Sequence, residues 1–491
     1  MMKDKNVSKL SQHKIKKGRV VTPFNDAFGD TLEFNAWNTE RLPEYLWLAL
    51  ILDHYGRTTG FEKAGAILYS VSTINSELLQ PKLSALFNMN TELQEKVYKT
   101  ICRYIAPDIL APLTVVYRME QYQLFNDFFY NPQISVEERI SVIENIIRRY
   151  YPHQSFKATD LRFLALSLQL FNGRICISKD CSVTAEALKN YAYTSHEDER
   201  MQMYRPAIRN IEGAVEMEAK NPSFVKHFWS EIGMLSQCKP MMIEFKKDER
   251  KVTDYISDTK DVLKFVLFSN KEKSLTDSKF TVVIGSTNYA LRIFNEVIDN
   301  KLNNLIMGRH AVRTMIEVYI MLKYLLKKEH EKPNVWREYQ MYGISKYKLI
   351  LLKARENNAV ADERHIVTPI IDAIVNEKMW EEFIDIDLRY FDQQGIREKS
   401  TYVDEKELYD LYYDYDSNYA HGLWGAVRES AMLSCDNPAH QFHNVPDIDA
   451  VQLLPSVQTD CEMIMKKIMN LVNNLYMLPE WYTESYKDDR K

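Results

Sequence analysis

Glycine, proline and cysteine are scarce in this sequence, and their scarcity narrows the fold class. The 491 residues include 14 Gly, 16 Pro and 6 Cys. Few glycines and prolines disfavour a turn-rich β architecture, because tight turns depend on both residue types. Six thiols spread along so long a chain do not make the dense framework of a disulfide-rich secreted protein. The composition therefore favours a helical protein with reduced cysteines.

Long apolar runs and nucleotide-binding motifs are also missing. No apolar run reaches the roughly 18 residues that a membrane-spanning helix needs, and the N-terminal segment lacks the apolar centre of a signal peptide. The sequence contains no Walker-type phosphate loop, Rossmann glycine string, H-E-x-x-H or G-x-S-x-G. We therefore expect a cytoplasmic protein with no membrane contact, no cofactor and no ATP-driven chemistry.

The charge is mildly negative overall but strongly positive at the N-terminus. A net charge of −5 gives no overall attraction to nucleic acid. Within residues 3–19, however, Asp4 is the only acid among the basic side chains Lys3, Lys5, Lys9, Lys14, Lys16, Lys17 and Arg19. We interpret residues 1–30 as a basic flexible arm, either a solvated tail or a contact for an RNA or DNA backbone.

Helical patterns begin at about residue 42 and continue almost to the end of the chain. The segment PEYLWLALILDHYGR opens with Pro43, which suits a first helical turn, and it carries a broad apolar face. Ser135 and Glu138 have the spacing of a capping box at the start of another helix. The short apolar segment RICIS, residues 174–178, is the one predicted strand. These patterns predict an all-α fold.

A charged segment, residues 239–258, predicts a linker between two helical domains. An N-terminal helical array is predicted over 31–238 and a C-terminal helical bundle over 259–485. The bundle contains the longest predicted helices, at 279–299, 302–329, 333–356, 361–383, 404–432 and 447–477. Helices of this length pair antiparallel, and their facing side chains can form a site inside the bundle.

The first segment with candidate site residues is IMGRHAVRTMIEVYIMLKYLL, residues 306–326. At 100° per residue, Arg309, Arg313 and Glu317 fall on one flank of a helix. Farther along, Ile320 and Tyr324 occupy the same flank, so the helix becomes apolar nearly all round. The polar patch is either a site near the point where burial begins or an exposed face with four-apart ion pairs.

The second segment is residues 404–432, which include YDYDSNYAHGLWGAVRES. In one continuous helix, a single stripe would hold Glu407, Asp410, Asp414, Ser417, His421 and Arg428. Ser417 and His421 are four apart, so their side chains would be neighbours, and Asp414 could orient the imidazole or raise its pKa. Such a histidine suits acid–base chemistry near neutral pH. The alternative is a solvent-facing stripe.

Aromatic residues and two glycines accompany this stripe. Gly422 and Gly425 flank the pair Leu423-Trp424 and would let a ligand or another backbone approach closely. Tyr415 and Tyr419 present aromatic faces that suit base stacking, although packing in a bundle core is their commoner use. The predicted binding residues are therefore Asp414, Tyr415, Tyr419, Trp424 and Arg428.

The two segments, through RHAVRTMIE and YDSNYAH, resemble a family of uncharacterised bacterial proteins. That family has an Arg-x3-Glu helix and a later Tyr/Ser-x3-His helix, in a domain distantly similar to the HEPN bundles of antiviral and toxin–antitoxin systems. The resemblance covers roughly 260–480 and implies an intracellular, dimeric helical bundle that acts as a defence ribonuclease. HEPN nucleases carry an arginine four to six residues before the histidine. Here Ser417, Asp416 and Tyr415 hold those places, so Arg309 or Arg313 would supply the cation.

Two functional hypotheses follow. The first is a metal-independent ribonuclease-like effector of the abortive-infection type, in which His421 is the acid or base and Ser417 its hydrogen-bond neighbour. Arg309 and Arg313 would bind phosphate and stabilise the transition state, and Glu317 would orient an arginine. The second is a non-catalytic helical adaptor or sensor whose polar stripe is a structural network. The expected partners are RNA, a partner protein or a second copy of the chain.

The remaining cysteines and histidines are predicted to bind no metal. Cys176 and Cys181 are the only close pair of thiols, and no second pair stands at zinc-like spacing, so reduced thiols are the better interpretation. His440 and His443 lie in a predicted loop, AHQFHNVPD, without a nearby set of carboxylate and histidine ligands.

Overall fold

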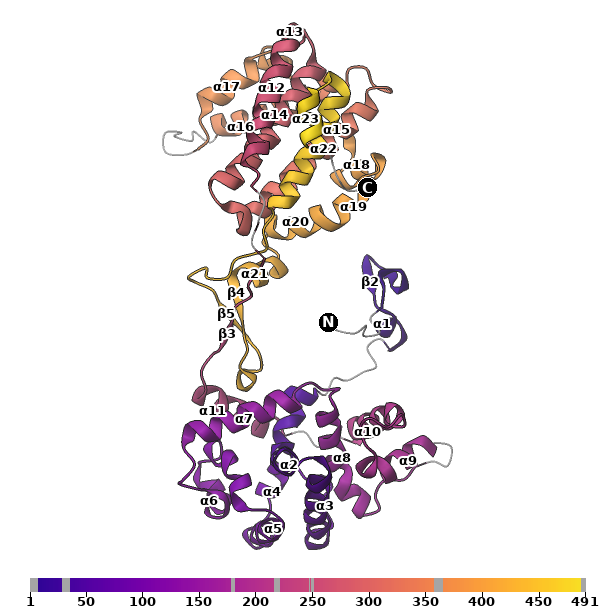
Figure 1. The fold of residues 1–491 in the computed structure, drawn as a ribbon, viewed down its shortest axis with the longest axis vertical. Coiled ribbons are helices and arrows are strands. Elements are labelled where there is room, and N and C mark those ends of the chain that lie inside the picture. Colours follow the sequence, from indigo (N-terminus) through magenta and orange to yellow (C-terminus); the bar gives the residue numbers. More distant parts are fainter. Residues whose placement is uncertain are drawn as a thin grey trace. The chain divides into compact units, whose positions relative to one another are not determined.

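The computed structural model describes most of the chain and divides it into two compact units. The described residues are 8–28, 36–177, 182–215, 221–246, 248, 251–356 and 365–486. Unit 1 comprises residues 1–240 together with 434–443, and unit 2 comprises 241–433 and 444–491 (Figure 1). The division after Pro240 falls inside the predicted linker, 239–258. The return of residues 434–443 to unit 1 had no counterpart in the sequence analysis.

Helices dominate both units, so the predicted all-α class is confirmed. The strands of the described residues form two small sheets. β1 (Lys14–Lys16) pairs antiparallel with β2 (Arg19–Val21), and β3 (Pro240–Met241), β4 (Met432–Cys435) and β5 (Asn444–Pro446) form a sheet in the order β3-β4-β5. The strand predicted at 174–178 is wrong over residues 174–177, which are irregular; residue 178 lies outside the described residues.

Residues 14–28, part of the predicted basic arm, form a hairpin followed by the short helix α1 (Pro23–Phe28). Lys17 and Gly18 both have positive φ, 47° and 75°, as a type I′ turn requires. Lys14 donates a hydrogen bond of 2.6 Å to Asp26, and Lys16 pairs with the same carboxylate. These two hydrogen bonds lower the pKa of Asp26 to about 2. Lys3 and Lys5 lie outside the described residues.

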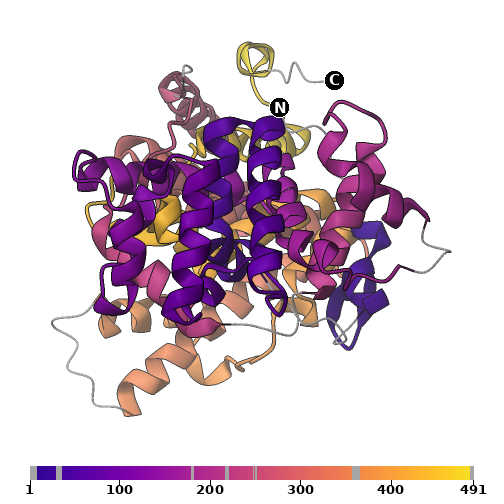
Figure 2. The same ribbon diagram turned by 90° about the horizontal axis from the view of Figure 1, so that it is seen from below.

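Unit 1 is built from helices of moderate length around an aromatic-rich core. They are α2 (Leu42–Tyr55), α3 (Arg57–Ile74), α4 (Leu83–Phe87), α5 (Thr91–Tyr104), α6 (Gln123–Phe129), α7 (Val136–Tyr150), α8 (Phe156–Phe171), α9 (Ser182–Asn190), α10 (Met201–Val215) and α11 (Pro222–Leu235). α2 is buried from Leu42 to Leu52 and packs against α3, α7 and α8. Figure 2 shows the indigo and violet helices of this unit side by side. The predicted capping box of α7 is confirmed, because Ser135 and Glu138 bond each other's backbone N–H.

Unit 2 has a separate core centred on α15. Its helices are α12 (Thr253–Ser269), α13 (Lys273–Thr276), α14 (Ser278–Asp299), α15 (Ile306–Lys328), α16 (Val335–Glu356), α17 (Thr368–Asn376), α18 (Ile396–Tyr402), α19 (Lys406–Leu408), α20 (Asp414–Ala420), α21 (Trp424–Ala431), α22 (Gln458–Tyr476) and α23 (Glu480–Ser485). α15 packs against α14, α18, α20 and α22. None of the described helices combines the length and the apolar character needed to span a membrane.

Three of the long helices predicted in unit 2 are shorter or broken. In place of a helix over 361–383 the described residues contain α17, and in place of 447–477 they contain α22, which begins shortly after Pro455. A proline lacks the N–H that a helix interior uses, so it favours a helix start downstream. The helix predicted over 404–432 is interrupted twice, first by a π-helical turn at Tyr409–Tyr413 and then at residues 421–423.

Candidate functional site

The two segments singled out by the sequence come together in unit 2, where α15 packs against α20. Arg313 and Glu317 of α15 meet Ser417 of α20 and Tyr413 of the π-helical turn before it. We call these four residues the α15–α20 network. The contact between Arg313 and Ser417 joins positions 104 residues apart in the sequence. The predicted convergence of these groups is therefore present for Arg313, Glu317 and Ser417.

Hydrogen bonds in this network run in one direction. Arg313 donates from Nε to Ser417 Oγ at 3.2 Å and from Nη2 to the Tyr413 hydroxyl at 2.7 Å. The Tyr413 hydroxyl donates in turn to Glu317 Oε1 at 2.6 Å, and Ser417 Oγ donates to the Tyr413 carbonyl oxygen at 2.7 Å. The guanidinium also lies 4.7 Å from the centre of the Tyr413 ring. Each hydroxyl thus accepts one bond from the arginine and donates one elsewhere.

Charge within the network is balanced. Glu317 Oε1 lies 3.4 Å from Arg313 Nη2, and both side chains are partly exposed. An ion pair in such a position contributes little by itself, on the order of 0.2–1 kcal/mol. Burial and the hydrogen bond to Glu317 raise the pKa of Tyr413, so its hydroxyl stays protonated. Among the described residues, Nη1 of Arg313 has no partner and is the donor that remains for a ligand.

Arg309, one turn earlier on α15, lies in a more buried cluster with Asp416 and Asp460. The Arg309 side chain donates to the carbonyl oxygens of Asn303, at 3.2 Å, and Pro455, at 2.5 Å. Burial raises the pKa of Asp416 to about 7, although Arg309 opposes this shift, and burial also raises the pKa of Asp460. A carboxyl group that titrates near neutral pH beside a cation is a common property of functional sites.

Asp416 is a candidate that the sequence analysis passed over. It is buried in α20, with 4% of its surface exposed, as are Tyr419 of the same helix and Tyr413 of the preceding π-helical turn. The signal that could have identified it is an acidic residue between two tyrosines at helical spacing, on the apolar rather than the polar face.

His421 does not join the α15–α20 network. It is exposed and caps the C-terminus of α20, where its backbone N–H donates to the Ser417 carbonyl at 3.0 Å. Among the described residues, the imidazole makes no hydrogen bond or ion pair, and the Ser417 hydroxyl is already used by Arg313 and Tyr413. The predicted hydrogen bond between the side chains of Ser417 and His421 is therefore not formed.

The helix ends at His421 because of Gly422. This glycine has φ +59°, and its N–H donates to Tyr419 while that of Leu423 donates to Asn418. These two bonds are those of a Schellman motif, in which glycine is favoured because it adopts a left-handed conformation without strain. Gly422 thus terminates the helix, rather than standing within it to admit a ligand.

The predicted stripe of six polar residues is consequently wrong as a continuous feature. The π-helical turn at Tyr409–Tyr413 inserts an extra residue and rotates Glu407 and Asp410 away from the line of Asp414 and Ser417. Beyond the break at Gly422, Arg428 belongs to α21 and donates to the Met432 carbonyl at 3.1 Å.

The predicted binding residues are distributed over buried and exposed positions. Tyr415 donates to the Glu429 carboxylate, at 2.7 and 2.8 Å to its two oxygens, and its hydroxyl lies 3.2 Å from that of Tyr419. Tyr419 is buried, whereas Asp414 is exposed and Trp424 is 66% exposed. Trp424 is therefore the predicted aromatic residue whose ring is most accessible for stacking.

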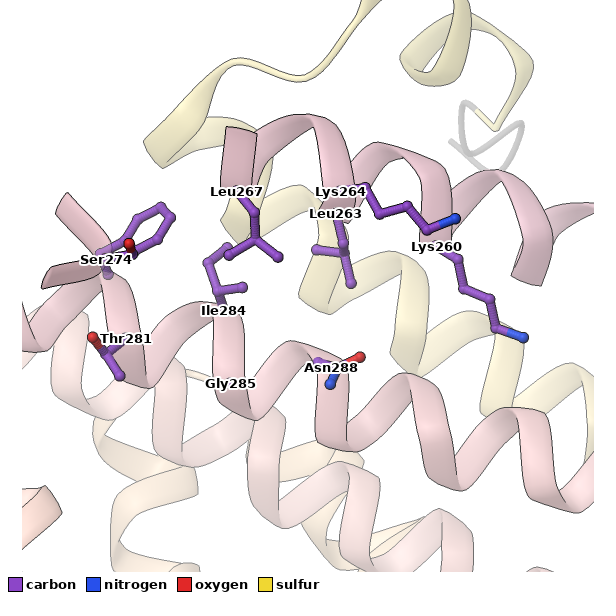
Figure 3. Close-up of a pocket in the computed structure, with 10 residues that line it drawn as sticks. Lys260, Leu263, Lys264, Leu267, Ser274, Thr281, Ile284, Gly285 and Asn288 are labelled. Carbon is purple, nitrogen blue, oxygen red and sulfur yellow. The ribbon is translucent and has the colours of Figure 1, made fainter. Parts of the chain in front are cut away.

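A groove in unit 2 lies between α12 and α14 and shares no residue with the α15–α20 network. Its volume is about 400 Å³. Figure 3 shows Leu263 and Leu267 of α12 pointing toward Ile284 of α14, with Lys260 farther along α12. Lys260 Nζ donates a hydrogen bond of 2.6 Å to Asn295 Oδ1. The groove is mainly apolar and offers no acid–base pair.

Four possible metal ligands come together in unit 1, although the sequence analysis predicted none. Their donor atoms all lie within 4.8 Å of one another, and the residues are Cys238, Cys435, His440 and His443. The sequence signal was incomplete, because Cys435, His440 and His443 are close in the chain but the fourth residue is 202 positions from His440. Cys176 is exposed, and Cys181 lies outside the described residues.

Comparison with known proteins identifies a similarity over part of unit 2 and over residues 434–440 of the segment that returns to unit 1. Residues 282–440 match a family described as a family of unknown function (DUF5677). The predicted resemblance to an uncharacterised family is confirmed to this extent, while its extension to HEPN bundles stays a prediction. A search of curated proteins and a search of solved structures each find no match. The matched stretch contains both α15 and α20, and therefore the whole α15–α20 network.

Proposed function

We propose that the α15–α20 network and His421 form the active site of a metal-independent, ribonuclease-like effector of antiviral defence. The observation that carries this proposal is the contact between Arg313 and Ser417, 3.2 Å long. It joins the two segments on which the resemblance to defence proteins rests. The partly exposed guanidinium of Arg313 on α15 and the exposed imidazole of His421 at the C-terminus of α20 are the groups that RNA cleavage needs.

In this proposal RNA is cleaved by its own 2′-hydroxyl. His421 accepts the proton of that hydroxyl, whose oxygen attacks phosphorus, and the proton is then returned to the departing 5′ oxygen. The products are a 2′,3′-cyclic phosphate and a free 5′-hydroxyl, so atoms and charges balance. Arg313 stabilises the extra negative charge on the phosphorane, and Glu317 and Tyr413 fix the orientation of the guanidinium. Trp424 provides a surface on which a neighbouring base can stack.

The decisive experiment compares two exposed histidines of unit 2. Purified wild type, His421→Ala and His365→Ala are incubated with single-stranded RNA in the presence of EDTA, and the ends of the products are identified. We expect His421→Ala to lose about 10²–10⁴-fold in cleavage rate, the usual share of an acid–base group. The free energy of unfolding should change by less than about 0.5 kcal/mol, because the imidazole is exposed. His365→Ala should cleave like wild type.

A second candidate function, a non-catalytic adaptor or sensor, is favoured by the internal pairing of the network. The hydroxyls of Tyr413 and Ser417 are both satisfied within the protein, and Arg313 is paired with Glu317. Such a network can fix how helices pack without any chemistry. Absence of RNA cleavage by the wild-type protein, together with a loss of stability in Arg313→Ala, would favour the adaptor over the nuclease.

A further inference from the structure

A cluster of two thiols and two imidazoles in unit 1 lies outside the site discussed so far. We refer to Cys238, Cys435, His440 and His443 as the Cys–His cluster. We propose that this cluster binds one zinc ion in tetrahedral coordination and that the ion ties residues 434–443 to the remainder of unit 1. This proposal is independent of the proposed nuclease activity, which uses residues of unit 2.

Distances between the donor atoms fit a zinc tetrahedron. With Zn–S near 2.3 Å and Zn–N near 2.0–2.1 Å, sulfur and nitrogen ligands of one ion stand about 3.5 Å apart. In the Cys–His cluster, Cys238 Sγ lies 3.3 Å from His440 Nδ1 and 3.3 Å from His443 Nε2, and Cys435 Sγ lies 3.7 Å from His440 Nδ1. The four atoms thus enclose a space of the size that a zinc ion takes.

The hydrogen bonds of His440 fix the ring nitrogen that faces the thiols. His440 Nε2 lies 3.1 Å from the Gly233 carbonyl oxygen and 3.0 Å from Ser236 Oγ, which itself donates to the Ile232 carbonyl. Both neighbours can only accept from the ring, so Nε2 carries the hydrogen and Nδ1 presents its lone pair to the cluster. A metal-bound histidine is normally held in this way by an acceptor on its other nitrogen.

Backbone groups hold the ligands in place. The N–H of Lys239 donates to Cys435 Sγ at 3.4 Å and so fixes the position of this sulfur. The chain turns back through Gln441 and Phe442, whose φ values are 55° and 53°, unusual for residues other than glycine. This turn brings His443 next to Cys435, whose N–H donates to the His443 carbonyl at 2.8 Å.

The segment that carries three of the ligands is anchored in the core of unit 1. Ala439 belongs to that core, and the fully buried Asn437 donates to Glu144 at 2.9 Å and to the Gln237 carbonyl at 2.7 Å. The short helix Pro438–His440 packs against α7 and α11. Because the protein supplies four ligands, no position is left for water, which is the arrangement of structural rather than catalytic zinc sites.

Zinc suits this donor set better than the harder cations. Thiolate and imidazole ligands select zinc over magnesium and calcium, which bind oxygen. Two other states of the cluster are conceivable: a disulfide between Cys238 and Cys435, and four uncharged side chains joined only by hydrogen bonds. A disulfide would leave no S–H to donate to the imidazoles. In the hydrogen-bonded state Cys238 would donate to His443 Nε2 and Cys435 to His440 Nδ1, so uptake of metal is the measurement that separates this state from the zinc site.

The test measures metal in the purified full-length protein after dialysis with excess zinc. We expect one zinc per chain in wild type and in Cys176→Ser, a control at an exposed thiol outside the cluster. The double variant Cys238→Ser/Cys435→Ser should hold none. His443→Ala should bind zinc at least about 10-fold more weakly, by analogy with the loss on removing supporting groups, and His443→Cys should restore binding because a thiolate can occupy the same position.

Cobalt substitution tests the site in the wild-type protein, so the result does not depend on whether any variant folds. Wild-type protein loaded with Co²⁺ should show the visible bands of tetrahedral cobalt and a thiolate-to-metal charge-transfer band. The proposal is overturned if folded wild type takes up no metal, if the double cysteine variant keeps one zinc, or if the cobalt spectrum lacks the thiolate band. A Cys238–Cys435 disulfide in the native protein, with no metal uptake after reduction, would overturn it as well.

Discussion

The α15–α20 network of unit 2 and the Cys–His cluster of unit 1 both join residues that are far apart in the sequence, but they hold them differently. In the α15–α20 network, long side chains on helices bond one another, and each hydroxyl both accepts and donates. In the Cys–His cluster, one side chain comes from a strand, one from a short helix and two from irregular segments, and backbone groups fix their orientation.

This difference indicates which of the two depends on an added ion. The α15–α20 network contains its own positive and negative charges, and the hydroxyls of Tyr413 and Ser417 are bonded within it. The Cys–His cluster contains four donors directed at one point and no cation of its own. Loss of one side chain should therefore remove from the first only the interactions of that side chain, whereas loss of the ion should weaken every contact of the second.

Metal removal is expected to produce the largest change in stability, and this change should be confined to unit 1. A chelator should lower the free energy of unfolding of unit 1 by more than about 4 kcal/mol, the contribution of a ligand present at about 1,000 times its Kd. Hydrogen exchange, measured with and without chelator, should speed up in residues 434–443 and in α11. The exchange rate of α15 should not change. Equal protection of residues 434–443 with and without chelator would show that the Cys–His cluster, like the α15–α20 network, does not depend on a metal ion.

Asp416 should make unit 2 lose stability as pH rises. Its pKa is about 7 in the folded protein but near 4 in an unfolded chain, so between these values the folded state binds the extra proton. The free energy of unfolding therefore falls as pH increases from about 4 to about 7, by up to about 4 kcal/mol.

Asp416→Asn removes this titration and should be more stable than wild type above pH 7. Its free energy of unfolding should also fall less than that of wild type between pH 4 and pH 7. Urea unfolding across this range measures the difference. Asp414→Asn is the matched control, because Asp414 lies two residues away on α20 and is exposed. An equal pH dependence in Asp416→Asn and wild type would exclude Asp416 as the titrating group.

Tyr413→Phe should have the smallest effect of the three, because it removes only one hydroxyl from the α15–α20 network. That hydroxyl bridges Arg313 and Glu317, so its loss should cost about 1.5–3 kcal/mol, as for hydrogen bonds to charged groups. Tyr412→Phe serves as the control, since Tyr412 is a neighbour in the same π-helical turn. Denaturant unfolding that ranks the two variants equally would contradict the proposed bridging role.

The α15–α20 network could be predicted from the sequence better than the Cys–His cluster could. Arg313, Glu317 and Ser417 follow the helical period within their own segments, and a polar flank at the edge of a buried helix indicated that they face another element. His421 was misplaced, because a spacing of four places two side chains together only while the helix continues, and Gly422 ends it.

The metal ligands could not be predicted from spacing. The turn near Cys435, His440 and His443 is formed by Gln441 and Phe442, which are left-handed. Neither residue type is typical of turns, so the sequence did not predict one there. The fourth ligand, Cys238, becomes their neighbour through the return of residues 434–443 to unit 1, and a local pattern contains no information about that return. Asp416 was missed for a related reason, because its buried state depends on α15 and α22 around it.

The return of residues 434–443 to unit 1 has a consequence for how the protein is made. While the ribosome is still translating unit 2, the earlier part of unit 1 already has most of its core but lacks Asn437, Ala439 and three of the four zinc ligands. Unit 1 therefore cannot be finished in the order in which it is synthesised. In a truncated chain that ends before residue 434, the short helix Pro438–His440 would not cover α7 and α11. The surfaces of these two helices would then be accessible to chaperones and proteases.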